Sequence, residues 1–296
     1  MPARQLSEGA RGPARRSSPP AHASGHRRSN GHKPLLCRSR ASILGAHIAR
    51  VYNYWLGGQD NFAADRAAAE VVITSYPTVP ASVRAQREFL GRAVGYLAGE
   101  VGIRQFLDVG TGLPTANNTH EVAQRVAPES RVVYVDNDPI VLAHARALLA
   151  SDPQGATAYL DADLRDTSEI LAEAANTLDF SQPIAVMLIG VLHCVPDSDD
   201  PAGLVRRLLG AVPPGSYLVI AHPASDIHAT AVGSAANRLN QVMADPVTMR
   251  SHAEVARFFD GLDLVEPGVV QLHRWRAVPA DADVELANYG GVARKP

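Results

Sequence analysis

Two glycines follow a short apolar segment near the middle of the chain, within Phe106–Thr115. The order is an apolar strand pattern, then Gly-Thr-Gly, then a helical pattern. Glycines let a backbone approach a ligand closely, and the free N–H groups at a helix start attract an anionic group. An ordinary tight turn is the alternative, because Thr115 stands where a third glycine would complete the dinucleotide fingerprint. The residues predicted to form this ligand-binding turn are Asp108, Gly110, Thr111 and Gly112.

A second strand pattern ends in acidic residues at Val132–Asp138. Asp136 comes 24 residues after the second glycine. A carboxylate at this position accepts hydrogen bonds from ribose hydroxyls in nucleotide-binding sheets. Asp138 precedes Pro139, so we assign it to the N-cap of the next helix. The sequence therefore predicts that Asp136, with Asn137 beside it, binds the ribose of a nucleotide-like cofactor.

A third strand pattern is followed by Asp161, Asp163 and Leu164. A carboxylate can accept a hydrogen bond from the exocyclic amine of adenine, and the next backbone N–H can donate to a ring nitrogen. We therefore predict that Asp163 and Leu164 bind adenine. The alternative is that these acids, together with Asp166, are ordinary surface turn residues.

A histidine follows the fourth strand pattern, in the segment Leu188–Asp197. Strand ends in a doubly wound sheet meet at one edge, so His193 is expected beside the nucleotide. We predict that His193 acts as an acid or base in catalysis, with Asp197 as the second candidate. The alternative is a structural histidine that only packs. Cys194 has no acid/base partner by motif and is interpreted as a packing residue.

The elements that must position these residues alternate between strands and helices. Short apolar strands separated by helices indicate a parallel sheet covered on both faces. The fold class is thus α/β, with a doubly wound, mostly parallel, seven-stranded sheet. The last two of the seven strands are expected to form a closing hairpin around Pro267-Gly268. The predicted strands are 105–109, 131–135, 157–160, 184–191, 217–221, 262–265 and 269–272.

The chain before the first strand divides into two parts. Residues 1–40 hold nine Lys or Arg and one acid, so they carry a charge of +8 within a chain of net charge −2. They contain too few apolar residues to offset the entropy of ordering, so we expect a disordered basic tail. Residues 41–103 show three helical patterns, and residues 104–296 the alternating pattern. At Gly57-Gly58 the first helix should end, with at least one of the two glycines at positive φ.

Composition excludes several classes of protein. The two cysteines, Cys37 and Cys194, cannot build a disulfide framework or a multi-cysteine zinc site, and we expect no metal. No run of about 18 apolar residues is present, so we expect no membrane span and a cytoplasmic protein. The basic tail leaves nucleic-acid binding open, but no aromatic residue is interleaved in it for base stacking, so we do not expect that partner.

The N-terminal helices carry the most distinctive segment of the chain. Residues Ala49–Arg66, with the sequence ARVYNYWLGGQDNFAADR, resemble the S-adenosyl methyltransferase family once catalogued only as a domain of unknown function. Asn53 and Gln59 depart from the family pattern, in which Asp and Lys are common at these positions. The likeness covers roughly residues 42–296. Further segments that resemble the family lie at 106–121, 133–138, 192–197 and 213–218.

The resemblance implies a class I, Rossmann-like methyltransferase fold with an N-terminal helical cover. It also implies S-adenosylmethionine as the cofactor and methylation as the reaction. The cover is expected to fold over the cofactor, with an aromatic surface that includes Tyr54. Backbone and amide groups of Gly58 and Asn61 would then lie at the cofactor's amino-acid end. The methyl acceptor is expected to be a small molecule, and the sequence does not specify an oligomeric state.

Two other functions compete with this hypothesis. A nicotinamide-dependent oxidoreductase could use the same kind of sheet, with a hydride acceptor near His193. A sensor or inactive homologue would bind S-adenosylmethionine without turnover. The missing third glycine and the expected closing hairpin favour the methyltransferase.

Overall fold

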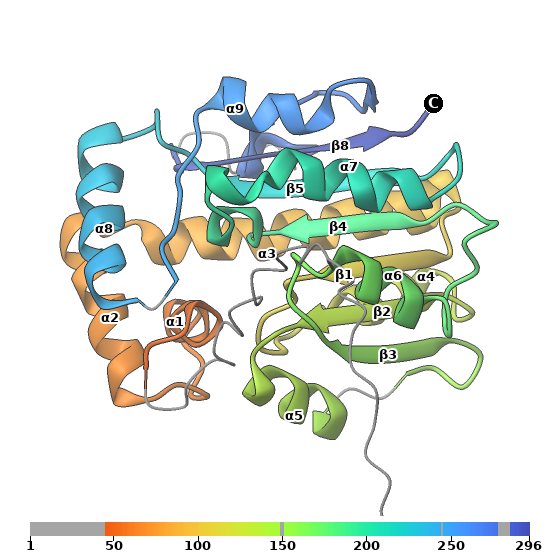
Figure 1. The fold of residues 1–296 in the computed structure, drawn as a ribbon, viewed down its shortest axis with the longest axis horizontal. Coiled ribbons are helices and arrows are strands. Elements are labelled where there is room, and N and C mark those ends of the chain that lie inside the picture. The colour runs from red at the N-terminus through yellow and green to blue at the C-terminus, as the bar shows by residue number, and fades with distance from the viewer. Residues whose placement is uncertain (1–44, 149–150, 244, 278–284) are drawn as a thin grey trace, which may run out of the picture. The chain divides into compact units, whose positions relative to one another are not determined.

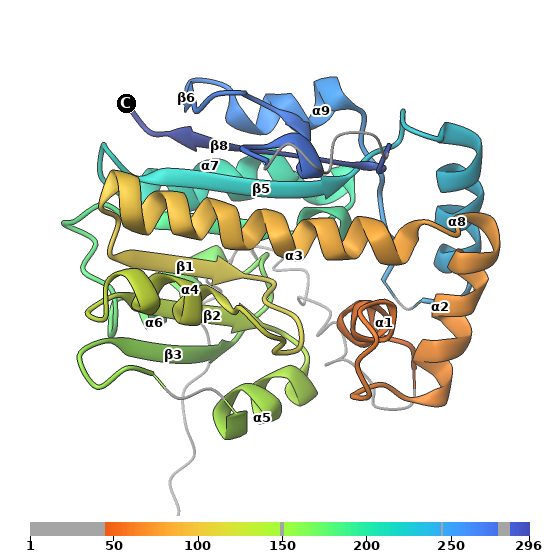
Figure 2. The same cartoon turned by 180° about the vertical axis from the view of Figure 1, so that it is seen from behind.

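The computed structural model describes residues 45–296 apart from 149–150, 244 and 278–284. The predicted tail at 1–40 lies outside the described residues. The described chain forms one sheet with helices on both of its faces (Figures 1 and 2). The strands are β1 (Gln105–Val109), β2 (Arg131–Asp136), β3 (Ala156–Asp161), β4 (Ala185–Ile189), β5 (Tyr217–Pro223), β6 (Asp263–Leu264), β7 (Val270–Gln271) and β8 (Asn288–Arg294).

The sheet has the order β3-β2-β1-β4-β5-β8-β6, and β7 also pairs with β8. All the pairs among β1 to β5 are parallel, whereas β8 runs antiparallel to β5. The doubly wound, mostly parallel sheet predicted from the sequence is therefore confirmed. Because the chain leaves β1 first toward β2 and later toward β4, the carboxyl end of β1 lies at the point where the strand order reverses.

The expected closing hairpin is wrong. β6 and β7 do not pair with each other, since both pair with β8, and the described residues form a sheet of eight strands rather than the seven expected. β8 was missed because it contains Gly290 and Gly291, which weaken a strand pattern. The structure gives the reason for one of these glycines: a Cβ at Gly290 would lie 2.5 Å from the carbonyl oxygen of Ile220 on β5.

Alternating side chains of each strand pack on opposite faces of the sheet. Phe106 belongs to a core with α3 and α4, whereas Leu107 belongs to a core with α6 and α7. Figure 2 shows α3 running along one face, and Figure 1 shows α6 and α7 on the other. The helices are α1 (Ile48–Trp55), α2 (Ala63–Ser75), α3 (Val79–Tyr96), α4 (Thr119–Val126), α5 (Pro139–Leu148), α6 (Thr167–Ala174), α7 (Pro201–Ala211), α8 (Ala229–Val242) and α9 (His252–Ala256).

A third core forms where α1 and α2 meet α8, beyond the carboxyl ends of the strands. It contains Val51 and Trp55 of α1, Val72 of α2, and Val232 and Leu239 of α8. α8 was not among the helices predicted from the sequence. Its buried residues Val232, Ala235, Ala236 and Leu239 do recur at helical spacing, but two of the four are alanines, so the apolar stripe contains few large side chains.

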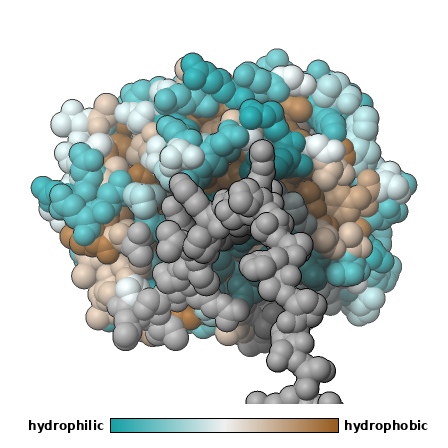
Figure 3. Space-filling model, viewed as in Figure 1, coloured by the Kyte–Doolittle hydropathy of each residue, from teal (hydrophilic) through white to brown (hydrophobic). Residues whose placement is uncertain are grey.

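The surface differs from this interior. In Figure 3, hydrophilic and hydrophobic residues are interspersed over the visible face of the described chain. No helix of the described residues is long and apolar enough to cross a membrane.

Candidate functional site

Three aspartates lie at or just after the carboxyl ends of β1, β2 and β3, the edge of an open α/β sheet where ligands bind. We use "the crevice" for Asp108 and the 110–112 turn after β1, Asp136-Asn137 after β2, and Asp163-Leu164 after β3. The parallel pairing of the three strands aligns these ends at one edge of the sheet. The sequence-predicted strand-end residues are thus brought to the same edge, as parallel topology requires.

The Gly-Thr-Gly turn adopts a backbone that favours glycine. Gly110 has φ +75° and Gly112 has φ +68°. The Gly110 N–H donates to the carbonyl oxygen of Val135 at 2.8 Å, which ties the turn to β2. A Cβ at Gly110 would collide with the side chain of Val191, whereas a Cβ at Gly112 would meet nothing within 4 Å. The turn is therefore closed on its β4 side and open at Gly112, as close approach of a ligand requires.

Asp136 faces this turn. Its Oδ2 accepts a hydrogen bond from the Gly112 N–H at 2.8 Å, and its Oδ1 accepts one from the Asp138 N–H at 2.9 Å. Burial raises the pKa of the Asp136 carboxyl, and the two backbone N–H donors oppose that shift. A carboxylate has about four acceptor positions, so two remain for a ligand.

Asp108 is the most enclosed acid of the crevice, with 3% of its surface exposed. Its Oδ2 accepts a hydrogen bond from the Thr119 hydroxyl at 2.6 Å. Burial raises the pKa of Asp108 to about 6, although Thr119 and the charge of Arg87 lower it. The Thr111 hydroxyl donates to the carbonyl oxygen of Asp108 at 3.1 Å, so it holds the turn rather than facing outward.

The third strand end is more open. Asn137 donates through Nδ2 to Oδ2 of Asp163 at 3.3 Å, which joins the ends of β2 and β3. Asp163 also forms an ion pair with Arg165 at 3.0 Å. Leu164 is buried in the core on the α6 side. The carboxylate of Asp163 is thus held in place while 27% of its side chain stays exposed.

Arg87 of α3 belongs to this region, although no sequence motif marked it. Its charge contributes to the pKa of Asp108, which places the guanidinium near that carboxylate. Its Nη2 makes long hydrogen bonds of 3.2–3.4 Å to carbonyl oxygens of Ala116 and Asn117. Its Nε is buried and has no hydrogen-bond partner among the described residues. A buried donor without a partner next to an open turn is consistent with a site for an anionic ligand group.

The residues predicted on the N-terminal helices to bind the cofactor, Tyr54, Gly58 and Asn61, form hydrogen bonds within these helices and their connector. The Tyr54 hydroxyl donates to Oε1 of Glu70 on α2 at 2.5 Å. Asn61 donates through Nδ2 to Oδ1 of Asn53 at 2.8 Å and to the carbonyl oxygen of Gly58 at 2.9 Å. These bonds fasten the connector between α1 and α2. The structure does not bring these side chains into hydrogen bonds with the strand-end residues.

A buried ion-pair network nevertheless fastens α1 to the crevice. Arg50 of α1 is fully buried and pairs with Asp65 and with Asp138, each at 3.0 Å. Asp138 also accepts a hydrogen bond from the Ile140 N–H at 2.9 Å, so its predicted role as the cap of α5 is confirmed. In addition, Asp60 of the connector lies 3.7 Å from His144 of α5. The link between the cover and the crevice therefore runs through Asp138, two residues after Asp136.

His193 lies in the short helical turn Leu192–Cys194 that follows β4. Arg250 holds this turn by donating to the carbonyl oxygens of Leu192 at 2.9 Å and Val195 at 2.8 Å. Arg250 also pairs with Asp197 at 2.7 Å, so the second candidate base has a positioning contact. Burial, and secondly the charge of Arg250, lowers the pKa of His193 to about 4. His193 is therefore neutral near pH 7.

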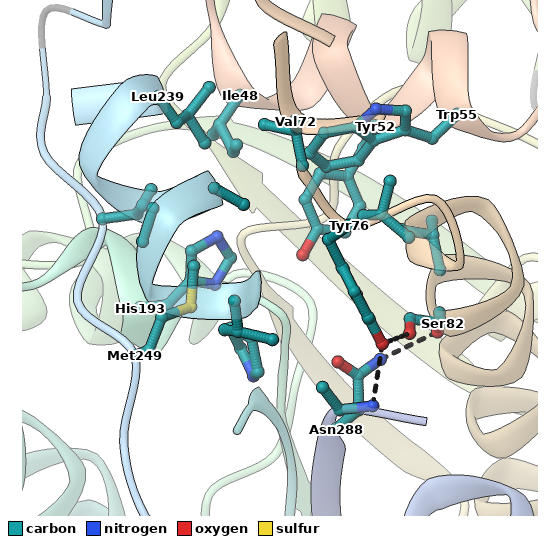
Figure 4. A pocket seen from close by; sticks show the side chains of 18 residues that line it. Ile48, Tyr52, Trp55, Val72, Tyr76, Ser82, His193, Leu239, Met249 and Asn288 are labelled. Atoms are coloured by element: carbon teal, nitrogen blue, oxygen red, sulfur yellow. Dashed lines mark hydrogen bonds between the residues drawn. The ribbon is translucent and has the colours of Figure 1, made fainter. Parts of the chain in front are cut away.

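The ring of His193 lines an apolar cavity. We use "the cavity" for this space, which is bounded by α1, α2, the start of α3, the Leu192–Cys194 turn and α8 (Figure 4). No candidate metal-binding cluster of His, Cys, Asp or Glu occurs among the described residues.

A doubly wound sheet with a glycine turn and acids at successive strand ends is the architecture of class I methyltransferases. The family described as S-adenosyl methyltransferase matches residues 38–296, and the chain belongs to that family. It is thus an S-adenosylmethionine-dependent methyltransferase. The resemblance inferred from the N-terminal segment is confirmed, and the family excludes the nicotinamide alternative.

Two solved structures are similar over most of the chain. A DUF574 family protein from Streptomyces avermitilis is 49% identical, with 85% of this chain and 98% of that chain covered and a TM-score of 0.83. A candidate methyltransferase from Thermobifida fusca is 43% identical, with 85% and 95% covered and a TM-score of 0.78. No curated protein matches the chain.

Proposed function

We propose that this methyltransferase binds S-adenosylmethionine in the crevice and transfers its methyl group to a small-molecule acceptor. The observation that carries the binding site is Asp136, a buried carboxylate at the end of β2 that faces the open Gly112 turn at 2.8 Å. Its two remaining acceptor positions suit a pair of ribose hydroxyls. The proposal therefore assigns the ribose to Asp136 and its neighbour Asn137.

The other crevice residues fit the remaining parts of the cofactor. Adenine offers an amine, which suits the carboxylate of Asp163, and the N–H of Leu164 suits a ring nitrogen. The amino-acid end offers an ammonium, which suits Asp108, and a carboxylate, which suits Arg87. An ammonium beside Asp108 would favour its ionised form and lower its raised pKa. Asp163, Asp136 and Asp108 thus offer hydrogen-bond acceptors to the adenine amine, the ribose hydroxyls and the ammonium, in that order. Arg87 offers a cation to the carboxylate at the amino-acid end.

When bound, the cofactor supplies an electrophilic methyl group on a sulfonium. The protein then mainly orients the reactants and excludes water. His193 is neutral near pH 7 and can accept a hydrogen bond or a proton from the acceptor. The low pKa makes it a weak base, so it suits a proton that becomes acidic as the acceptor is methylated.

Calorimetric titration of the whole chain with S-adenosylmethionine, S-adenosylhomocysteine and NAD tests the site. Asp136→Ala removes an acceptor of charge-assisted hydrogen bonds worth about 1.5–3 kcal/mol, so the Kd for S-adenosylmethionine should rise about tenfold to a hundredfold. Asp260→Ala, which removes an exposed carboxylate after α9, is the control. An unchanged Kd in a folded Asp136→Ala protein would remove the crevice assignment.

A further inference from the structure

The cavity and the crevice lie on two sides of the Leu192–Cys194 turn. Val191, at the start of this turn, blocks the space beside Gly110, and His193 lines the cavity. The turn is rigid because Arg250 holds the carbonyl oxygens on both sides of His193. A molecule bound in the cavity would therefore meet the cofactor site at His193.

None of the described residues that line the cavity has a charged side chain. Aliphatic residues of α8, such as Val232 and Leu239, form one wall, and the rings of Tyr52, Trp55 and Tyr76 form the other (Figure 4). Burying an ion without a partner costs several kcal/mol, so such walls disfavour charged ligands.

Most polar groups in the walls already have partners. The Tyr76 hydroxyl shares a hydrogen bond of 2.8 Å with the Ser82 hydroxyl and accepts one from the Ala287 N–H at 3.0 Å. Asn288 donates through Nδ2 to the carbonyl oxygen of Ser82 at 2.8 Å. Figure 4 shows these bonds at one end of the cavity. They build the wall at this end and leave the opposite end for a polar contact, where the rings of His193 and Tyr52 stack at 6.0 Å.

His193 offers that contact. Its ring is 2% exposed, and its Nδ1 is buried with no hydrogen-bond partner among the described residues. A buried polar atom without a partner costs about 1–3 kcal/mol, which a ligand with a hydrogen-bonding group would recover. A neutral imidazole has one donor and one acceptor nitrogen. A hydroxyl both donates and accepts, so it pairs with Nδ1 in either tautomer, whereas an alkyl amine would bring a charge into the cavity.

We propose that the cavity is the methyl-acceptor site and that the acceptor is an uncharged aromatic molecule whose hydroxyl hydrogen-bonds to Nδ1 of His193. This inference rests on the proposed function, because it takes the crevice as the cofactor site. The aromatic walls select the ring, the missing charges exclude ionic acceptors, and His193 places the hydroxyl at the boundary with the crevice.

Binding of matched probes to the whole chain, with S-adenosylhomocysteine present, tests the inference without turnover. The probes are 2-naphthol, 2-methoxynaphthalene, which cannot donate, and the anion 2-naphthoate. By calorimetry, 2-naphthol should bind about fivefold to tenfold more tightly than 2-methoxynaphthalene, the ratio expected for one hydrogen bond of about 1 kcal/mol. The anion should bind more weakly than both. Equal or tighter binding of the anion would overturn the proposal.

Variants of α8 test whether 2-naphthol binds in the cavity. Leu239→Trp should fill the cavity and abolish binding of 2-naphthol, and Ala235→Leu is a milder filling variant if the first does not fold. Val242→Trp is the matched control, because Val242 lies on the same helix and is 50% exposed. Unchanged 2-naphthol binding in a folded cavity-filling variant would show that the probe binds elsewhere and would overturn the proposal.

Variants of His193 test the polar contact. His193→Phe keeps a ring but should remove the preference for 2-naphthol over 2-methoxynaphthalene, and His193→Gln should retain part of it. A merely structural role would not change this ratio, so a preserved preference in His193→Phe overturns the contact.

The cofactor titrations separate the two proposals. Tight S-adenosylmethionine binding that depends on Asp136, without 2-naphthol binding, leaves the proposed function intact and overturns the acceptor site. Binding of 2-naphthol in the cavity without S-adenosylmethionine binding to the crevice overturns the proposed function, and with it the interpretation of the cavity as the acceptor site.

Discussion

The crevice and the cavity lie at the same edge of the sheet but have opposite chemistry. The crevice gathers three carboxylates, with the guanidinium of Arg87 nearby, whereas the residues known to line the cavity include no charged side chain in the described part of the chain. In both regions burial favours the neutral form of a titratable group. It raises the pKa of Asp108 to about 6 and lowers the pKa of His193 to about 4. One edge of the sheet thus carries a polar site, which we propose for the charged cofactor, and an apolar site, which we propose for a neutral acceptor.

The largest predicted effect concerns Arg50, which connects the two regions. This residue lies on α1, between the cavity-lining residues Ile48 and Tyr52, and pairs with Asp138 beside the crevice. Arg50→Met would leave the buried carboxylates of Asp65 and Asp138 without this partner, so we expect a loss of about 3–5 kcal/mol in the free energy of unfolding. Urea unfolding of the wild type and of Arg50→Met measures this loss of stability.

The same variant shows whether the two regions depend on each other. Arg50→Met should weaken binding of both S-adenosylmethionine and 2-naphthol if the network positions α1 for both sites. Arg84→Met, an exposed arginine on α3, is the control. Loss of only one kind of binding would show that the crevice and the cavity are organised independently.

The second prediction uses the opposite pKa shifts. For His193, the ordinary pKa is 6.5 and the folded value about 4. The unfolded state therefore binds more protons in this window, and the contribution of His193 to stability is lost as the pH falls from 6.5 to 4. The shift corresponds to about 3 kcal/mol. His193→Phe should consequently lose less stability than the wild type on acidification over this range.

Asp108 should behave in the opposite way. Its ordinary pKa is 3.8 and its folded value about 6, so the folded state binds more protons in this window. Its stabilising contribution is present below pH 3.8 and is lost as the pH rises through 6. Asp108→Asn should therefore lose more stability than the wild type on acidification. Thermal unfolding from pH 7 to 4 measures both variants, and slopes that change in the same direction would refute the contrast.

The sequence predicted the crevice better than the cavity, and the reason is physical. Crevice residues follow strands that are visible as apolar runs, and parallel pairing brings strand ends together without further information. Asp108, Asp136 and Asp163 were therefore placed at one edge. The cavity depends on how α1 and α2 pack against α8, a helix that lies more than 150 residues away in the sequence. Such packing leaves no local pattern in the sequence.

Gly57 and Gly58 show what the sequence alone could and could not predict about one turn. The expectation of a positive φ at Gly57-Gly58 is confirmed at Gly57, which has φ +82°. Gly58 is required for a different reason, because a Cβ there would lie 2.7 Å from Cγ of Asn53. The buried Asn53 side chain was not identifiable as its neighbour from sequence spacing. Likewise, Arg87 carried no motif, since only the docking of α3 beside β1 brings it near Asp108.

The third prediction concerns the boundary between the two regions. Gly110→Ala forces a left-handed conformation that costs about 1–2 kcal/mol and also displaces Val191. Gly112→Ala has the same backbone cost but open space around the new methyl group. We therefore expect Gly110→Ala to lower the melting temperature more than Gly112→Ala. Adding Val191→Ala should partly rescue Gly110→Ala, and the absence of rescue would show that Val191 is not the obstacle.

The smallest predicted effect tests Arg87 as the contact for the cofactor's carboxylate. Arg87 as a whole is partly exposed, and its Nη2 already has long hydrogen bonds to carbonyl oxygens. Arg87→Ala should therefore raise the Kd for S-adenosylmethionine about threefold to tenfold, at the low end of a charge-assisted hydrogen bond. Arg84→Ala, an exposed arginine one helical turn earlier, should not change it. The discriminating ligand is 5′-methylthioadenosine, which keeps the adenine and ribose but lacks the amino-acid end. Arg87→Ala should leave its Kd unchanged, whereas Asp136→Ala should weaken both ligands. If Arg87→Ala weakens 5′-methylthioadenosine as much as S-adenosylmethionine, Arg87 supports the shape of the crevice rather than binding the carboxylate.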